Sequence, residues 1–150
     1  MATQFLDSRL SLNNIYGTGT AILPATPTLL GDIGLQTVGA IGTPNESDVR
    51  IELWGTIGVS GTAANTVNIF VERGGTGVFG TGLLIFAATL PLTAGPASRL
   101  ETFAAGDFPP ATDVATGQIR YTMYASNTGP NDVTITGPVT FNGLAQAGTS

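Results

Sequence analysis

Three glycines of the chain have the spacing of a nucleotide-binding loop. Gly75, Gly77 and Gly80 match G-x-G-x-x-G after an expected strand, and Glu101 follows about 20 residues later, where a ribose-binding carboxylate would stand. In a dinucleotide fold this loop must open a helix, yet further Gly and Pro residues interrupt the stretch that follows. We therefore expect a glycine-rich connection between two strands, and no bound nucleotide.

The ten acidic residues are the next candidates for chemistry. A calcium site needs about six to eight converging oxygens, and the acidic spacings do not match an EF-hand loop. A carboxylate pair for glycoside hydrolysis is compatible with the composition, but the chain has only one Trp and three Tyr to line a carbohydrate groove. We expect solvated carboxylates in turns and no metal ion. The acids considered for these roles are Glu46, Asp48, Asp107, Asp113 and Asp132.

The residues that the chain lacks exclude most other catalytic chemistry. There is no Cys and no His, and all five basic residues are arginines, so thiol nucleophiles, disulfides, Ser-His-Asp triads and Schiff bases are excluded. A net charge of −5 and a pI near 4.2, with the arginines scattered singly, disfavour nucleic acid as a partner. The sequence predicts a protein that is not an enzyme, uses no cofactor and binds no nucleic acid.

The hydrophobic pattern that must position any site has a period of two residues, which is typical of half-buried strands. Clusters of Gly, Pro, Asn and Asp separate the runs, and no amphipathic helix is evident. The pattern predicts an all-β fold, an antiparallel jelly-roll sandwich of about eight strands over residues 21–150, preceded by an extended N-terminal connector over residues 1–20. The alternating runs cover residues 49–59, 67–72, 119–124 and 133–141.

The chain has few of the charged residues that usually protect the exposed faces and edges of strands. Charged residues make up 10% of the chain, and none occurs between Arg73 and Arg99. The apolar stretch there, Leu83–Leu92, is about half the length of a membrane-spanning helix, so we expect a buried strand and no membrane span. Natural monomers protect exposed strand faces and edges with charges, which this chain lacks. We expect other copies of the chain to cover these surfaces, with Trp54 in a second core or an intersubunit contact rather than a ligand platform.

Residues 5–12 form a short alternating strand pattern, followed by a stretch interrupted by Gly and Pro. One hypothesis is that this strand is donated to the sheet edge of a neighbouring copy, where main-chain hydrogen bonds would give affinity. The alternatives are the first strand of the chain's own sheet and a disordered tail. In the donated arrangement the residues that carry self-assembly would be Phe5, Leu6, Leu10 and Leu12 in the inserting strand, and Ile15 and Tyr16 at its junction.

Residues 48–145 resemble a known family. The segments VRIELWGTIGVSG, TVNIFVERGG, GQIRYTMYASN and VTITGPVTFNGLAQ follow one another in the order of similar segments in the small β-rich exosporium and endospore-appendage proteins of spore-forming Firmicutes. The resemblance implies a jelly roll similar to tumour necrosis factor domains that assembles as trimers or fibres on the spore surface. This chain has no Cys for the cross-links of several appendage subunits and no collagen-like repeat, so its assembly would be non-covalent.

We therefore expect a structural subunit that self-assembles by strand donation and face packing into a surface layer or a pilus-like fibre, a helical filament in the manner of an endospore appendage. The N-terminus lacks the pattern of a signal peptide, which suits a spore-surface protein released from the mother cell. Its partners would be copies of itself and an anchor protein on the spore surface. The alternative is a trimeric binding module, such as a viral or phage capsid, decoration or receptor-binding jelly roll. A two-carboxylate enzyme is the third class.

Overall fold

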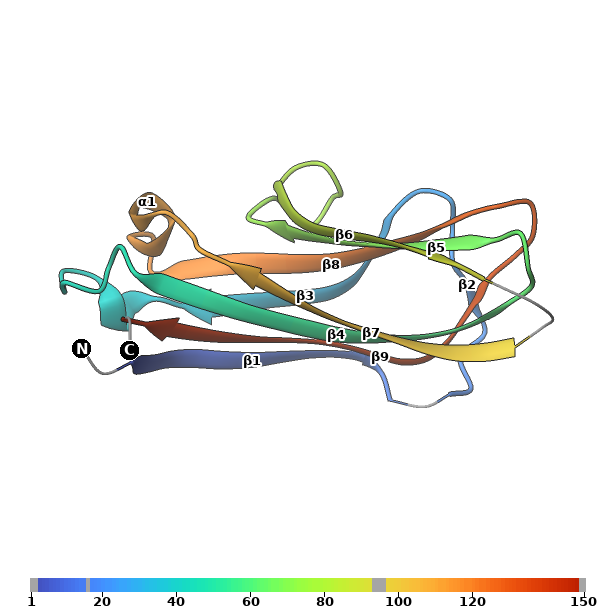
Figure 1. The fold of residues 1–150 in the computed structure, drawn as a ribbon, viewed down its shortest axis with the longest axis horizontal. Helices are drawn as coiled ribbons and strands as arrows, with labels where there is room; N and C mark the ends of the chain where they lie inside the picture. Colours follow the sequence, from blue (N-terminus) through green and yellow to red (C-terminus); the bar gives the residue numbers. More distant parts are fainter. Residues whose placement is uncertain (1–2, 16, 93–96, 149–150) are drawn as a thin grey trace.

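The computed structural model describes residues 3–15, 17–92 and 97–148, which form a sandwich of two antiparallel sheets (Figure 1). This confirms the predicted all-β jelly-roll class. Nine strands are found, one of them only two residues long. The elements are β1 (Gln4–Asn14), β2 (Ala21–Ile22), β3 (Thr28–Gln36), the 3-10 helix η1 (Val38–Ala40), β4 (Val49–Gly61), β5 (Thr66–Arg73), β6 (Leu83–Pro91), β7 (Ala97–Asp107), α1 (Ala111–Val114), β8 (Gln118–Thr128) and β9 (Thr134–Ala147).

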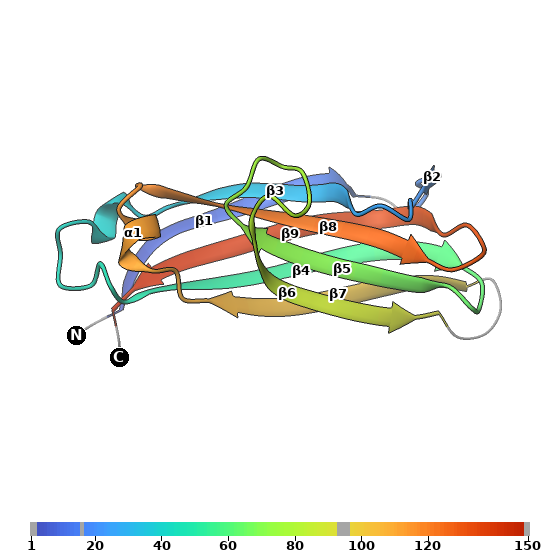
Figure 2. The same ribbon diagram turned by 90° about the horizontal axis from the view of Figure 1, so that it is seen from above.

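The strand order defines two sheets, which we call sheet A and sheet B. Sheet A has the order β1-β9-β4-β7, with β2 also paired to β9, and sheet B has the order β3-β8-β5-β6. The chain crosses from one sheet to the other at most of its connections, which is the jelly-roll arrangement. As a result β1 lies over β3 along one long side of the sandwich, and β6 and β7 lie along the other (Figure 2).

Alternation of side chains explains why these segments form strands with one buried face. Every second residue of β9 is buried, from Ile135 to Ala147, because β9 has a neighbour on both sides and sheet B beneath it. The inward side chains of the two sheets form one core, as expected for a sandwich. The largest fully buried side chains of this core include Tyr121, Phe141, Leu35, Ile51, Leu53, Ile57, Ile69 and Met123.

Two glycines mark places where the backbone approaches other groups closely. A Cβ atom at Gly31 would lie 2.5 Å from the Cβ of Phe141, so the absence of a side chain lets the Phe141 ring pack against β3. A Cβ atom at Gly58 would overlap the carbonyl of Gly137, at the bulge where β4 and β9 shift register. These positions fix how closely the sheets and strands can pack.

The sequence pattern missed two strands. Residues 28–36 and 97–107 form β3 and β7, both at sheet edges. No described residue of β7 is buried, and β3 is interrupted by glycines, so neither strand has the strong alternation that marks β4 or β9. The alternating run predicted over residues 119–124 also ends too early, because β8 continues to Thr128.

The packing of Phe141 gives the first prediction. Phe141→Ala removes a fully buried ring from the centre of the core and should lower the free energy of unfolding by about 3–5 kcal/mol. The matched control is Phe108→Ala, because the Phe108 ring is largely exposed and lies under the Arg50 guanidinium at the surface, so its loss should cost about 1 kcal/mol or less. Chemical denaturation measures both, and equal losses would contradict this description of the core.

Candidate functional site

The N-terminal strand β1 is fixed to both sheets of the sandwich. Its backbone pairs with β9 of the same chain, and two of its side chains reach across to the edge of β3. The Asp7 carboxylate accepts a hydrogen bond from the Gln36 N–H at 2.9 Å, and the Ser11 hydroxyl accepts one from the Asp32 N–H at 3.2 Å. The single chain thus has the intramolecular arrangement, and exchange of β1 between chains remains a hypothesis.

Electrostatics make Asp7 the stronger of these two contacts. Burial raises the pKa of Asp7, but the N–H groups of Gln36 and Ser8 and the Arg9 side chain outweigh this effect and hold the pKa below its usual value. Arg9 lies 2.8 Å from the carboxylate and is half exposed. Asp7 is therefore charged at neutral pH and stabilises the contact of β1 with the edge of β3.

A bulge in β1 changes which predicted assembly residues share a face. The register with β9 shifts between Phe5 and Asp7, so Leu6 is the extra residue and packs against the core. Phe5 then joins Leu10 and Leu12 on the outer face of sheet A, where their exposed fractions are 64%, 61% and 54%. The alternation in the sequence had placed Phe5 opposite these leucines. Ile15 is exposed just after the strand, and Tyr16 lies outside the described residues.

The outer face of sheet A continues this apolar surface across all four strands. In one row of directly paired residues, Leu10 on β1, Asn142 on β9, Trp54 on β4 and Ala104 on β7 lie side by side. Trp54 is 41% exposed at the centre of the face, and no second core covers it within the described residues. We call this surface the outer face; its large exposed side chains are Phe5, Leu10, Leu12, Trp54, Leu100 and Phe108.

The outer face has almost no charge. Next to the row of Leu10, one row of paired residues contains three threonines beside a single leucine. Its members are Leu12, Thr140, Thr56 and Thr102. The outward side chains of its paired residues include one cation and one anion, which are Arg50 and Glu52 on β4. The formal charges of this pair cancel. The arrangement suits contact with another protein surface better than binding of a charged small molecule.

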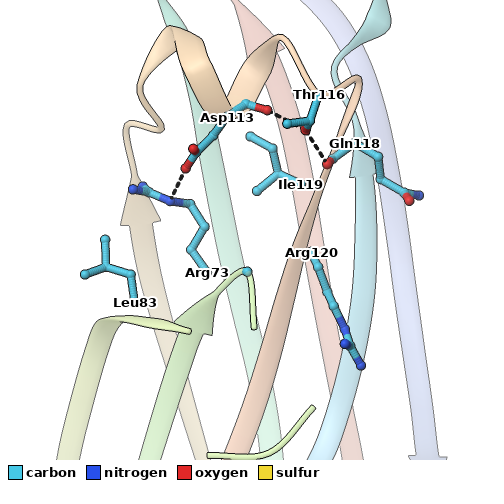
Figure 3. A pocket seen from close by; sticks show the side chains of 8 residues that line it. Arg73, Leu83, Asp113, Thr116, Gln118, Ile119 and Arg120 are labelled. Atoms are coloured by element: carbon cyan, nitrogen blue, oxygen red, sulfur yellow. Dashed lines mark hydrogen bonds and ion pairs between the residues drawn. The ribbon is translucent and has the colours of Figure 1, made fainter. Parts of the chain in front are cut away.

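A cavity of about 320 Å³ lies at one end of sheet B, between α1, β8 and the start of β6 (Figure 3). Arg73 at its wall is already paired: its guanidinium lies 2.8 Å from Asp107 and 2.9 Å from Asp113. Arg120, the second cation, lies 2.6 Å from Asp32 on β3. Both arginines therefore have carboxylate partners within the chain, which leaves neither as a ready anion-binding group.

A buried tyrosine completes the Arg73 cluster. The Tyr121 hydroxyl donates to Asp107 at 2.8 Å, and burial followed by the adjacent Asp107 carboxylate raises the pKa of this phenol. The phenol stays protonated and donates its hydrogen bond. Four elements, β5, β7, α1 and β8, meet in this cluster. The arrangement is that of a structural contact between the two sheets, in which one guanidinium pairs with two carboxylates.

The glycine-rich loop over residues 74–82 binds a carboxylate of its own chain. The N–H groups of Gly80 and Gly82 donate to the buried Glu72 side chain at 2.7 and 3.1 Å. The loop joins β5 to β6 as an antiparallel hairpin and opens no helix. This hairpin confirms the strand connection expected for the G-x-G-x-x-G match, and the Gly80 N–H of the match already has an acceptor within the chain.

The other acidic candidates lie apart from one another. Glu46 accepts a hydrogen bond from the Gly42 N–H, and Asp48 lies 3.6 Å from Arg50. In the part of the chain that the structure describes, no group of three acidic side chains converges as a metal site would require. Within the same residues, no helix is long and apolar enough to cross a membrane.

Comparisons with known proteins show the fold class. No family model matches the chain, and no curated protein matches it. Among solved structures, Eiger TNF from S. frugiperda is 13% identical, with a TM-score of 0.50, and the match covers 98% of this chain and 94% of that one. A chain of infectious bursal disease virus, Gx strain, is 11% identical with a TM-score of 0.49, and the match covers 94% of this chain. This chain spans about a third of the virus chain, 32% of its length.

The contacts of Asp7 predict how firmly β1 is held. Asp7→Ala removes a charged acceptor from the Gln36 N–H and should speed hydrogen exchange of the β1 amides about 10-fold at neutral pH. Arg9→Ala is the control, because an exposed ion pair contributes little. Unchanged exchange in the Asp7 variant would contradict the proposed anchoring.

This effect should depend on pH in one direction. Because the pKa of Asp7 is lowered in the folded chain, its contribution is complete above the usual value of 3.8 and is lost as the pH falls through the folded value. The difference in exchange between the unmodified chain and Asp7→Ala should therefore disappear in acid. A difference that persists at the lowest pH at which the chain stays folded would contradict the role of the charge.

Proposed function

We propose that this protein is a non-enzymatic structural subunit that self-assembles non-covalently into a surface fibre or layer. Two contacts would carry the assembly: packing of the outer face of sheet A against another copy, and exchange of β1 between copies. The observation that supports this most directly is the uncovered apolar outer face, because soluble monomers rarely leave a large continuous patch of this kind exposed.

The size of the outer face supports an extended contact. From Arg50 to Gly58 the rows extend about 26 Å along β4, and the four strands span about 14 Å from first to last. The projected area is about 400 Å², before the relief of the side chains is counted. A stable interface buries about 800 Å² on each partner, so the face would supply a large part of one interface and further contacts would supply the rest.

The charges of the face favour a second copy as the occupant. The chain carries a net charge of −5, so two copies repel each other over most of their surface. The outer face is an exception, since Arg50 and Glu52 cancel. When two such faces pack in antiparallel fashion, Arg50 of one copy can lie opposite Glu52 of the other, and the leucines and Trp54 lose contact with water.

Exchange of β1 would use contacts that the single chain already shows. β1 would lie between β9 and the edge of β3 in either arrangement. The N–H groups of β3 would donate to Asp7 and Ser11 whether β1 comes from its own chain or from a neighbour. The strand is joined to β2 by residues 15–20, a segment with two glycines. Each exchanged strand would link one copy to the next without a covalent bond.

The resemblance to exosporium and endospore-appendage proteins suggests the spore surface as the location, with an anchor protein there as a further partner. A trimeric binding module is the competing function, and size separates the two. A closed trimer stops at three copies, whereas a fibre or layer subunit continues to add copies as its concentration rises.

Charged residues on the outer face should suppress growth. The double variant Leu10→Glu with Leu12→Glu places like charges on two facing surfaces and should raise the concentration needed for assembly at least about 100-fold. The matched control is Val38→Glu with Val78→Glu, which changes two equally exposed residues away from the face. Sedimentation velocity over a range of concentrations measures this. Equal behaviour of the two variants would contradict face packing.

Strand exchange can be tested with a cysteine pair, because the natural chain has no Cys. Ser8 and Leu144 are paired across β1 and β9, so Ser8→Cys with Leu144→Cys should form a disulfide under mild oxidation. If β1 is exchanged in the assembled state, the disulfides link different chains and a non-reducing gel shows a ladder. Single chains with an internal disulfide would contradict strand donation and leave face packing intact.

A further inference from the structure

The second long side of the sandwich has two free strand edges. Within the described residues, β6 pairs only with β5, and β7 pairs only with β4. Both strands lie along the same side, in different sheets (Figures 1 and 2). Each therefore presents one row of main-chain N–H and C=O groups without a neighbouring strand, which is a template for pairing with another chain.

The composition of these edges does not protect them. β6 has the sequence LLIFAATLP, without a charge, and Leu83 and Leu84 are both exposed. On β7 the two charges nearest its middle, Arg99 and Glu101, lie 3.4 Å apart and compensate each other. Free edges in natural proteins usually carry lysines, bulges or covering loops, because an uncharged edge of this length aggregates. β6 has one bulge, at Ile85, and its pairing with β5 is regular from Phe86 to Pro91. A specific partner would protect the rest of these two strands.

The interior beneath these edges is also incompletely closed. None of the residues of β6 and none of the described side chains of β7 is buried. The rings of Phe86 and Phe103 stack here between the two sheets, with their centroids 5.0 Å apart. Both rings are only partly buried. At the end of β6, the Arg99 side chain also donates a hydrogen bond to the Pro91 carbonyl at 3.2 Å. The opposite side, between β1 and β3, is closed by the Asp7 and Ser11 hydrogen bonds.

The position of the aromatic pair suggests the symmetry of the partner. β6 runs from Leu83 to Pro91 and β7 from Ala97 to Asp107, so their middle residues are Ala87 and Thr102. Phe86 and Phe103 are each one residue from these middles. The middles of both edges thus lie over each other. A single two-fold axis, perpendicular to the sheets, can pass just outside the middle of both edges and pair each strand with its symmetry mate in antiparallel register.

We infer that β6 and β7 form a two-fold interface with a second copy of this chain, in which β6 pairs with β6 and β7 with β7. The axis would pass midway between Ala87 and its symmetry mate and between Thr102 and its symmetry mate. The inference rests on the proposed function only in taking the partner to be another copy. Sheet B would become a continuous eight-stranded sheet and sheet A would extend in the same way. Four phenylalanine rings, two from each copy, would then close the open side of both cores.

This interface would supply the further contacts that assembly needs in addition to the outer face. Pairing along both edges satisfies two rows of main-chain groups, and it joins two outer faces into one surface of double width. No pair of like charges is brought together on β7, because in this register Glu101 of one copy faces Phe103 of the other and Arg99 faces Ala105. A pair of copies joined in this way would be the unit that packs through its outer faces.

A cysteine scan tests the register. Ala87→Cys places one thiol next to the axis, where it faces its own symmetry mate at a Cα separation of about 5 Å, within the range of a disulfide. Thr102→Cys does the same on β7. Thr89→Cys is the matched control, because its symmetry mate lies about 14 Å away along the strand. Oxidised dimers should form at least about 10-fold faster for Ala87→Cys and Thr102→Cys than for Thr89→Cys, and equal rates would overturn the inference.

A second experiment separates this interface from the outer face. In the Leu10→Glu, Leu12→Glu chain the outer faces are blocked, and oxidising an added Ser8→Cys, Leu144→Cys pair in dilute solution holds β1 in its own chain, so strand exchange is blocked as well. Light scattering of this chain should give a mass of two chains. Adding Ala87→Lys and Thr102→Lys brings like charges together at the axis and should give single chains. Adding Ala63→Lys and Thr26→Lys instead, at exposed turn positions, should leave the pair intact.

The outcomes distinguish the two proposals. If the face-blocked chain is already a single chain, the two-fold interface is wrong and the proposed face packing is unaffected. If the unmodified chain stops at two copies, and the lysines at Ala87 and Thr102 dissociate it, the two-fold interface holds and the proposed assembly fails.

Discussion

A two-layer sandwich buries two of its four sheet faces, and the chain has very little charge with which to keep the other two in water. The two outer faces meet this constraint differently. On sheet B the loop between β5 and β6 folds back over the strands, and its Phe79 packs against Phe70 and Tyr124. Glu72 holds the loop in place through two N–H groups. In the part of the chain that the structure describes, sheet A has no such cover, and the proposed function therefore depends on its outer face.

The two long sides of the sandwich show the same contrast. Between β1 and β3, polar side chains satisfy the edge of the neighbouring sheet, and the charged Asp7 adds to the strength of this contact. Between β6 and β7 the sheets meet through stacked rings that water still reaches. One side is therefore complete within the chain, and the other gains most from a partner. An assembling subunit needs some surfaces whose contacts are satisfied within the chain and others that a second copy can cover.

The sequence predicts the central strands well because their alternation is set by burial. β4, β5, β8 and β9 have neighbours on both sides, and each was recognised from its period of two. The edge strands β3 and β7 were missed, since glycines or half-exposed residues blur their pattern.

The sheet face on which a given side chain lies was harder to predict. One bulge at Leu6 reverses the direction of Phe5, and a bulge depends on pairing with β9 that the local sequence does not encode. The row that joins Leu10 to Trp54 likewise requires the order of four strands, which comes only from the folded chain.

The central claim is that the uncovered surfaces of this chain are filled by further copies of it. Negative-stain electron microscopy of the purified, unmodified chain at neutral pH, at increasing concentration, tests this most directly. The account predicts open-ended filaments or sheets whose length grows with concentration while the repeat stays constant. Discrete particles of one fixed size at every concentration, whether single chains or closed trimers, would contradict it.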